Sequence, residues 1–228
     1  MENCSKTLSD SGTRRYFIGG SEARIIMGDD EVALIRLWRE KRGEIEPEDL
    51  SGNLLVQLGL ATEDLNRRWY EANTGQVVID VQRQIRHPVL RWMGATLDGR
   101  VQGSDAVFEA KFMLPWLFSE EAAAEKYMPQ LQHNMWVVAA RTAVLSVITG
   151  GGKWVEILAH ADPLYQHLIG AVSRAANSPN CLGSSRQNRG LKPCVLSIWG
   201  RRMPGRSSPR SSRIPIRRIS STSEPKPS

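Results

Sequence analysis

The chain has 228 residues, of which 41% are hydrophobic and seven are tryptophan, enough for one packed domain with or without a tail. Its three cysteines lie far apart, which excludes a disulfide framework and a cysteine-rich metal centre and indicates a reducing compartment. No apolar run is long enough to span a bilayer, and the first residues lack the apolar core of a signal peptide. We therefore expect a cytoplasmic protein without a membrane partner.

Charge is distributed unevenly along the chain. The formal net charge is +6, but residues 173–228 contain 12 Lys/Arg and one acidic residue, a net charge of +11. Residues 1–172 contain 18 basic and 23 acidic residues, a net charge of −5. The basicity belongs to the C-terminal part, so it does not indicate that the folded part binds nucleic acid.

The first residues, 1–13, are polar, and we expect them to be flexible. Two arginines, Arg14 and Arg15, then precede a short apolar run, two glycines and Ser21. This pattern predicts that Ser21 is the N-cap of a short helix over about residues 22–28. The amides of such a helix start, together with an arginine, can bind an anion, although an ordinary capped helix fits the same pattern.

Two helices are predicted next, over 30–41 and 52–74. The second is the longest helical pattern of the chain and ends before Gly75. We expect its apolar stripe to be buried: Leu54, Leu58, Ala61, Leu65, Trp69 and Ala72. Glu63 lies roughly opposite that stripe, so periodicity alone predicts a solvated surface glutamate.

A hairpin is predicted over 93–111, with Asp-Gly and Gly-Ser-Asp turn chemistry, after two strand-like patterns over 76–81 and 89–97. Asp98 ends the first run of the hairpin. Glu109 and Lys111 are two residues apart in the second run and therefore point to one side, which we expect to be exposed. Two carboxylates and an ammonium there indicate either a divalent-cation site or a solvated charged hairpin.

The rest of the pattern alternates between helix and strand. A helix is predicted over 120–141 with a break near Pro129, because proline is tolerated only in a first turn, and Gln130 lies off its buried stripe. Three elements follow: strands over 143–149 and 154–159 and a helix that begins near Asp162. This order indicates a mixed α/β fold with a largely sequential sheet.

The pattern ends near residue 173. Residues 173–228 contain 13 Ser and 7 Pro, and their apolar residues follow neither the helical nor the strand period, so we expect a disordered tail. The tail is either a basic arm for nucleic acid or an out-of-frame product joined to a domain that is truncated at its C-terminus. The folded domain is assigned to 14–172.

Five motifs occur in the chain in a defined order: IGGSEARIIMG at 18–28, QLGLATEDLNRRWYEANTG at 57–75, HPVLRWMGATLDGRV at 87–101, VFEAKF at 107–112 and YMPQLQHNMWVVAARTAVLSVITGGG at 127–152. In order and spacing they resemble the YqaJ-type phage recombinase exonucleases, relatives of phage lambda exonuclease in the PD-(D/E)XK nuclease superfamily. The resemblance covers about residues 14–172. It implies a restriction-endonuclease-like α/β core in which helices flank a mixed central sheet.

The resemblance also implies a role for each candidate residue. Asp98 and Glu109 would bind the metal, with the backbone carbonyl of Ala110 as a further oxygen ligand, and Lys111 would be the catalytic lysine. Four further residues take supporting roles: Glu63 as the helix glutamate at the metal, Gln130 as the glutamine that lines the site, and Arg14 (or Arg15) with Ser21 as the binding pair for a 5′-phosphate.

The function implied by this resemblance is a Mg²⁺- or Mn²⁺-dependent phosphodiester hydrolase. It would be a 5′→3′ exonuclease on linear duplex DNA in phage-type homologous recombination, in a bacterial or phage-infected cell. Its partners would be double-stranded DNA ends, a single-strand annealing recombinase and, in a ring-shaped homotrimer, further copies of itself. The alternatives are a related endonuclease or single-strand nuclease, and an inactive remnant that binds DNA or a partner.

Overall fold

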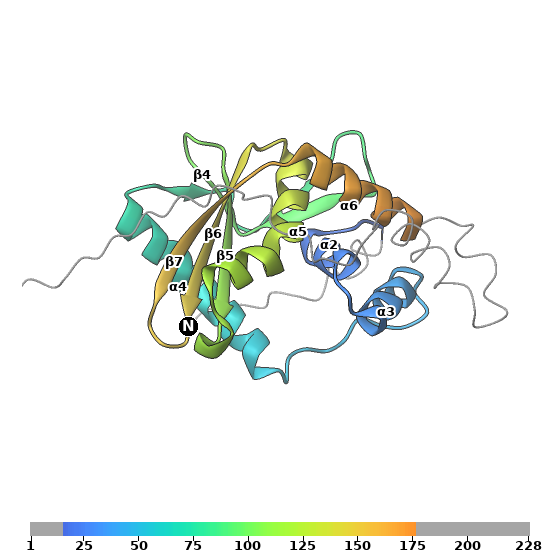
Figure 1. Cartoon of the computed structure of the whole chain (residues 1–228), viewed down its shortest axis with the longest axis horizontal. Coiled ribbons are helices and arrows are strands. Elements are labelled where there is room, and N and C mark those ends of the chain that lie inside the picture. Colours follow the sequence, from blue (N-terminus) through green and yellow to red (C-terminus); the bar gives the residue numbers. More distant parts are fainter. Residues whose placement is uncertain (1–15, 177–228) are drawn as a thin grey trace, which may run out of the picture.

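The structure is a computed structural model, and it describes residues 16–176. Three helices come first, then five strands, and then a helix–strand–strand–helix unit (Figure 1). The elements are α2 (Gly20–Met27), α3 (Glu31–Lys41), α4 (Leu54–Thr74), β1 (Val78–Ile79), β2 (Arg83–Arg86), β3 (Gly94–Leu97), β4 (Gly99–Val101), β5 (Val107–Met113), the 3-10 turn η1 (Pro115–Leu117), α5 (Glu120–Val138), β6 (Thr142–Thr149), β7 (Trp154–His160) and α6 (Pro163–Ala176).

The central sheet is mixed and has the strand order β1-β4-β5-β6-β7. Only β5 and β6 are parallel, and α5 connects them as a crossover helix, as parallel neighbours require. The other pairs of this sheet are antiparallel, and β2 and β3 form a separate antiparallel ribbon. The expected mixed α/β class with a largely sequential sheet is therefore confirmed.

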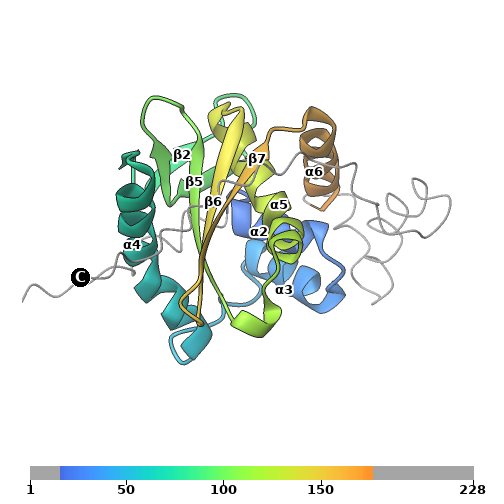
Figure 2. The same ribbon diagram turned by 60° about the vertical axis from the view of Figure 1, so that its left-hand side comes forward.

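Helices cover both faces of the central sheet (Figures 1 and 2). One face packs against α5, where Val107 of β5 joins Leu131 and Met135 in the main apolar core. The opposite face packs against α4 through Tyr70 and Phe108. Side chains of β5 therefore alternate between the two cores, which is the period of two expected of a strand buried on both faces.

The predicted buried stripe of α4 is wrong. Leu54 is 71% exposed, and Leu65 and Trp69 are 48% and 49% exposed, whereas Asn66 and Tyr70 are fully buried. The helix is held on the sheet by hydrogen bonds of Asn66 and by the ring of Tyr70, so its contact face is the one that also carries Glu63. Counting apolar residues could not find this face, because its anchor is a polar side chain.

The predicted break at Pro129 is also wrong. Helix α5 runs without interruption from Glu120 to Val138, with Ser119 as N-cap accepting the amide of Ala122 at 3.0 Å. An interior proline costs about 3 kcal/mol or more, because its ring removes one hydrogen bond and crowds the preceding turn. Here Pro129 is buried between packed neighbours on both sides of the helix, and that packing outweighs the local preference.

Helix α2, strand β2 and helix α6 differ from the sequence prediction. Helix α2 begins at Gly20 with Gly19 as N-cap, so Ser21 is an exposed residue of the first turn and not the cap. Strand β2 was not predicted, because the left-handed backbone of Asp80 and Gln82 starts it after a turn that periodicity does not show. Helix α6 continues to Ala176, past the boundary expected at 172.

The remaining expectations fall elsewhere in the chain. The segment 1–13, Arg14 and most of the tail lie outside the described residues. Within residues 16–176, none of the helices combines the length and apolar character needed to cross a bilayer.

Candidate active site

The turn between β3 and β4 positions Asp98. Strand β4 starts at Gly99, which pairs with Phe108 of β5, and a Cβ at Gly99 would overlap the side chain of Val78 on β1. Asp98 Oδ2 accepts the backbone amide of Ala110 at 2.9 Å. The hairpin register and this bond fix one oxygen of Asp98 against β5.

Glu109 and Lys111 point to the same side of β5, as the period of two predicts, but that side is not the exposed face we expected. Helix α5 covers it, and Glu109 is only 1% exposed. Lys111 Nζ forms an ion pair with Glu109 Oε1, and it also lies 5.5 Å from the ring centroid of Tyr127. A buried carboxylate is thus paired with a lysine from its own strand, so the interpretation as a solvated charged hairpin is excluded.

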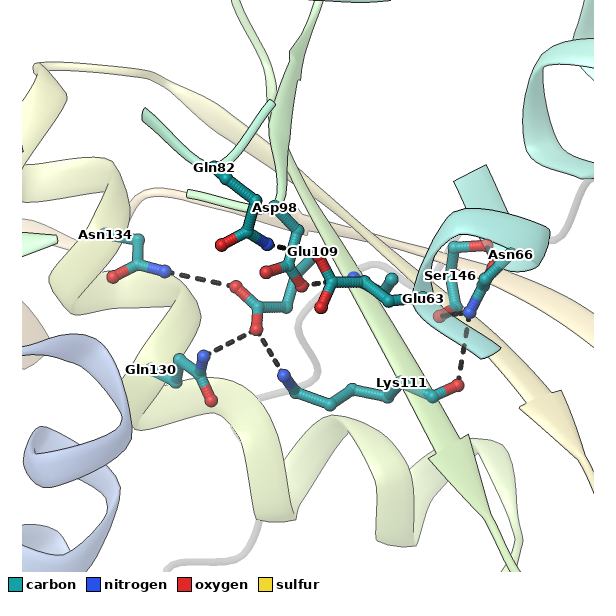
Figure 3. A network of polar contacts seen from close by, with 10 residues as sticks. Glu63, Asn66, Gln82, Asp98, Glu109, Lys111, Gln130, Asn134 and Ser146 are labelled. Carbon is teal, nitrogen blue, oxygen red and sulfur yellow. Dashed lines mark hydrogen bonds and ion pairs between the residues drawn. The ribbon is translucent and has the colours of Figure 1, made fainter. Parts of the chain in front are cut away.

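Helix α5 contributes two carboxamides that hold Glu109 (Figure 3). Gln130 Nε2 donates to Glu109 Oε1 at 2.5 Å, and Asn134 Nδ2 donates to Glu109 Oε2 at 3.1 Å. The two residues are one helical turn apart and therefore share a face of the helix. The sequence identified Gln130 but not Asn134, although the spacing of four from Gln130 was a signal that could have found it.

Helix α4 places Glu63 on the other side of the same cluster. Figure 3 shows its carboxylate pointing toward the region where Asp98 and Glu109 meet. It accepts a hydrogen bond from Gln82, in the turn between β1 and β2. The solvated surface position that periodicity predicts is therefore wrong, because the side chain faces Asp98 and Glu109. Gln82 had no sequence signal, because it is a turn residue.

Asn66 fixes α4 on the sheet one turn beyond Glu63. Its Nδ2 donates to the carbonyl oxygens of Lys111 at 3.2 Å and Ser146 at 2.9 Å, and its Oδ1 accepts the Ser146 hydroxyl at 2.5 Å. All of these groups except the partly buried Lys111 are removed from solvent. Asn66 therefore positions the helix that carries Glu63, a role that the sequence did not indicate.

The electrostatics of the cluster are dominated by burial and by carboxylate pairing. Burial and, after it, the charge of Asp98 raise the pKa of Glu109 to about 8, against the opposing effect of Lys111. Burial lowers the pKa of Lys111, but the charges of Glu109 and Asp98 together outweigh it, so the net shift is upward. A proton or a cation is therefore held more strongly here than at an isolated carboxylate.

The donor set suits a hard divalent cation. Carboxylate oxygens from Asp98 and Glu109 are the ligands such ions prefer, and Glu63 offers a third carboxylate from α4. Within residues 16–176 no three acidic, histidine or cysteine side chains lie close enough together to hold a metal without adjustment. Glu63 and Glu109 are instead engaged by Gln82 and by Lys111.

Of the residues predicted to bind a 5′-phosphate, Ser21 lies in the described part of the chain, and Arg14 and Arg15 do not. Ser21 lies in the first turn of α2, directly after Gly20, whose backbone packs against Gln130 and Asn134. The start of α2 is therefore beside the cluster. Glu22 closes this turn by accepting the amide of Gly19 at 2.9 Å and pairing with Lys41 at 2.8 Å.

The sequence is similar to one protein family and to one of its relatives of known sequence. The model of the YqaJ-like viral recombinase domain matches residues 11–146. Protein YqaJ of Bacillus subtilis (strain 168), described as uncharacterized, is 32% identical over 152 residues. The match covers 63% of this chain and 47% of YqaJ, so the chain spans about half the length of that relative.

Solved structures agree on the fold. The alkaline exonuclease LHK-Exo from Laribacter hongkongensis has a TM-score of 0.60 at 17% identity over 83% of this chain and 93% of its own. A phage-related exonuclease from Haemophilus somnus 129PT has a TM-score of 0.60 at 14% identity over 78% and 99%. The fold is that of the lambda-exonuclease-like PD-(D/E)XK nucleases, and because the family model matches more than half of the sequence, the chain belongs to the YqaJ-like viral recombinase domain family.

Proposed function

We propose that this chain is a metal-dependent deoxyribonuclease that degrades linear duplex DNA from its ends in the 5′→3′ direction during phage-type recombination. The observation that carries the proposal is the unit of Asp98, Glu109 and Lys111 at the junction of β4, β5 and α5, in which Glu109 is buried and the other two are partly buried. A buried carboxylate next to a second carboxylate is unfavourable for the fold alone and is typical of sites that bind a cation or perform acid–base chemistry.

The metal would be held by Asp98, by Glu109 and by the carbonyl of Ala110, with Glu63 on the opposite side. When bound, Mg²⁺ or Mn²⁺ supplies Lewis-acid stabilisation of the negative charge that develops on the phosphate. Carboxylate and carbonyl oxygens in this number leave room for water ligands, which both ions retain in protein sites.

The chain's own groups have separate tasks in phosphodiester hydrolysis. A water oxygen must attack phosphorus while the bond to the 3′-oxygen breaks and that oxygen gains a proton. Lys111 has three N–H donors, and the one that Glu109 accepts leaves others for the attacking water or a phosphate oxygen. Gln130 keeps Glu109 in place while this happens. Ser21, with Arg14, would bind the 5′-phosphate of the end that is being digested.

Digestion of defined DNA tests this proposal. Linear duplexes with a 5′-phosphate or a 5′-hydroxyl, and a closed circular duplex, would be incubated with Mg²⁺ and then with EDTA. We expect release of nucleotides from the 5′ ends of the linear DNA only, faster with the phosphate and abolished by EDTA. Cleavage of the circle would identify an endonuclease, and no cleavage of any substrate would identify an inactive binding remnant.

A further inference from the structure

We propose that Asn134 is a positioning residue of the metal site, and that Gly20 is a glycine because it keeps Asn134 in place. The proposal rests on the function proposed above, in that it takes Glu109 as a metal ligand. It concerns two residues on different elements, α5 and the first turn of α2, that meet behind the Glu109 carboxylate.

Asn134 and Gln130 each donate a hydrogen bond to a different oxygen of the Glu109 carboxylate. Each oxygen of that carboxylate accepts one amide hydrogen bond from α5, Oε1 from Gln130 and Oε2 from Asn134 (Figure 3). Two donors on two oxygens fix the rotation of the carboxylate plane, which one donor does not do. Partners of this kind, which orient a ligand without touching the metal, typically change metal affinity 10–100-fold when they are lost.

The orientation of Asn134 itself is set by packing. The side chain is 1% exposed, and its Oδ1 has no hydrogen-bond partner among residues 16–176. A carboxamide with a free oxygen could rotate unless its surroundings prevented this. The backbone of Gly20 closes that side, because a Cβ there would overlap Asn134 Oδ1 and lie 3.0 Å from both Asn134 Cγ and Gln130 Cγ.

Residue 20 therefore has no room for a side chain beside the two amides that hold Glu109. Its helical position does not need glycine for backbone reasons, since positive φ values in the described chain occur at other residues. Alanine would favour the helix at this position. The cost of a methyl group is instead steric, and it acts on the two side chains that orient Glu109. The preceding Gly19 differs, because a Cβ there would meet only ordinary contacts at 3.9 and 4.0 Å.

The experiment measures Mn²⁺ binding to the DNA-free chain by isothermal titration calorimetry, with the thermal unfolding temperature recorded in parallel. Asn134→Ala should weaken Mn²⁺ binding at least about tenfold. Gly20→Ala should weaken Mn²⁺ binding by a similar factor. It should lower the unfolding temperature less than Asn134→Ala does. The methyl group of Gly20→Ala should cost less affinity in the Asn134→Ala variant than in the unmutated chain, because only Gln130 is then left for it to displace.

Two controls separate positioning from folding. Gly19→Ala adds the same methyl group to the neighbouring residue and should leave the affinity unchanged. Gln132→Ala removes another buried amide of α5, one that bonds His160 O at 2.7 Å and does not contact the site, and it should lower stability without weakening Mn²⁺ binding.

The possible results are distinct. If the unmutated chain binds Mn²⁺ and the Asn134 and Gly20 variants bind it equally well, the inference fails and the proposed function stands. If Gly20→Ala weakens binding as much in the Asn134→Ala variant as in the unmutated chain, the two residues act independently and the link between them is wrong. If the unmutated chain binds no Mn²⁺, both proposals fall together.

Discussion

The two helices that flank the central sheet, α4 and α5, differ in which side chains they bury. Helix α5 is buried almost all round and carries polar side chains inside: Gln130, Gln132, His133 and Asn134. Helix α4 leaves apolar side chains in solvent, among them Leu60 at 61% exposure, and contacts the sheet through Asn66 and Tyr70. The difference shows that polar side chains in this molecule are placed by the site and by the hydrogen bonds that support it, not by amphipathic periodicity.

The largest effect we expect is on catalysis, where both helices and the sheet converge. Glu109→Ala, Asp98→Ala and Lys111→Ala should each lower the rate of nucleotide release by roughly 10³-fold or more, and double variants should add little, because these residues act as one unit. Glu63→Ala on α4 should also reduce the rate strongly. The measurement is turnover on linear duplex DNA with Mg²⁺.

Asp64→Ala is the matched control for Glu63→Ala. Asp64 is the next residue of α4, but it faces solvent, and its ion pairs within residues 16–176 are with Arg67 and Arg68 of its own helix. Its loss should leave turnover near that of the unmutated chain. Equal losses in the two variants would mean that the face of α4 assigned to the site is wrong.

A second, smaller effect is expected on stability, when a buried amide side chain of α4 or of α5 is removed. Asn66→Ala on α4 and Gln132→Ala on α5 each remove a buried amide and leave its partners unsatisfied, so each should lower the free energy of unfolding by about 2–3 kcal/mol. Urea denaturation measures this. Only Asn66→Ala should also lower turnover, because Asn66 holds the helix that carries Glu63. A comparable loss of turnover with Gln132→Ala would remove the distinction.

The smallest effect concerns the pH dependence of stability. Burial lowers the pKa of His133 from 6.5 to about 4, although its hydrogen bond with Gly94 opposes the shift. The ring is therefore neutral in the fold, and the stability it contributes is present above pH 6.5 and is lost as the pH falls toward 4. Between pH 7 and 4 the loss should be about 3 kcal/mol at most.

His133→Gln isolates this contribution, because glutamine keeps an amide donor for the Gly94 carbonyl and does not titrate. We expect the free energy of unfolding of the variant to fall less steeply over this pH range than that of the unmutated chain. Parallel curves for the two proteins would show that His133 is not the group responsible.

The sequence predicted the class of fold and the side of β5 that carries Glu109 and Lys111, because both depend on local patterns. The predicted hairpin pairing is wrong, because the run that ends before Asp98 pairs with β2, and β4 is the antiparallel partner of β5. Alternation along β5 places Glu109 and Lys111 on one side, and turn residues place Asp98 before β4. The order of helices and strands predicted the mixed sheet. Helix α3 begins one residue after the predicted start at 30, and the carboxylate of Asp30 accepts the amide of Ala33 at 3.0 Å.

What the sequence could not provide depends on contacts between distant segments. Glu63 turns inward because Asn66, three residues later, bonds with Ser146. Pro129 stays inside a helix because the packing around α5 outweighs its local cost. Asn134 and Gln82 join the site through partners on other elements, and no single-segment pattern contains that information.

The crossover from β5 through α5 to β6 has a consequence for the order in which the molecule forms. The bonds of Glu109 to Gln130 and Asn134 span only 21 and 25 residues, whereas the bonds of Asn66 to Lys111 and Ser146 span 45 and 80. Short loops close at a lower entropic cost than long ones, so local contacts tend to be acquired first during folding. We therefore expect the bonds that hold Glu109 to form early, within the β5-α5-β6 unit, and α4 to complete the site by docking later.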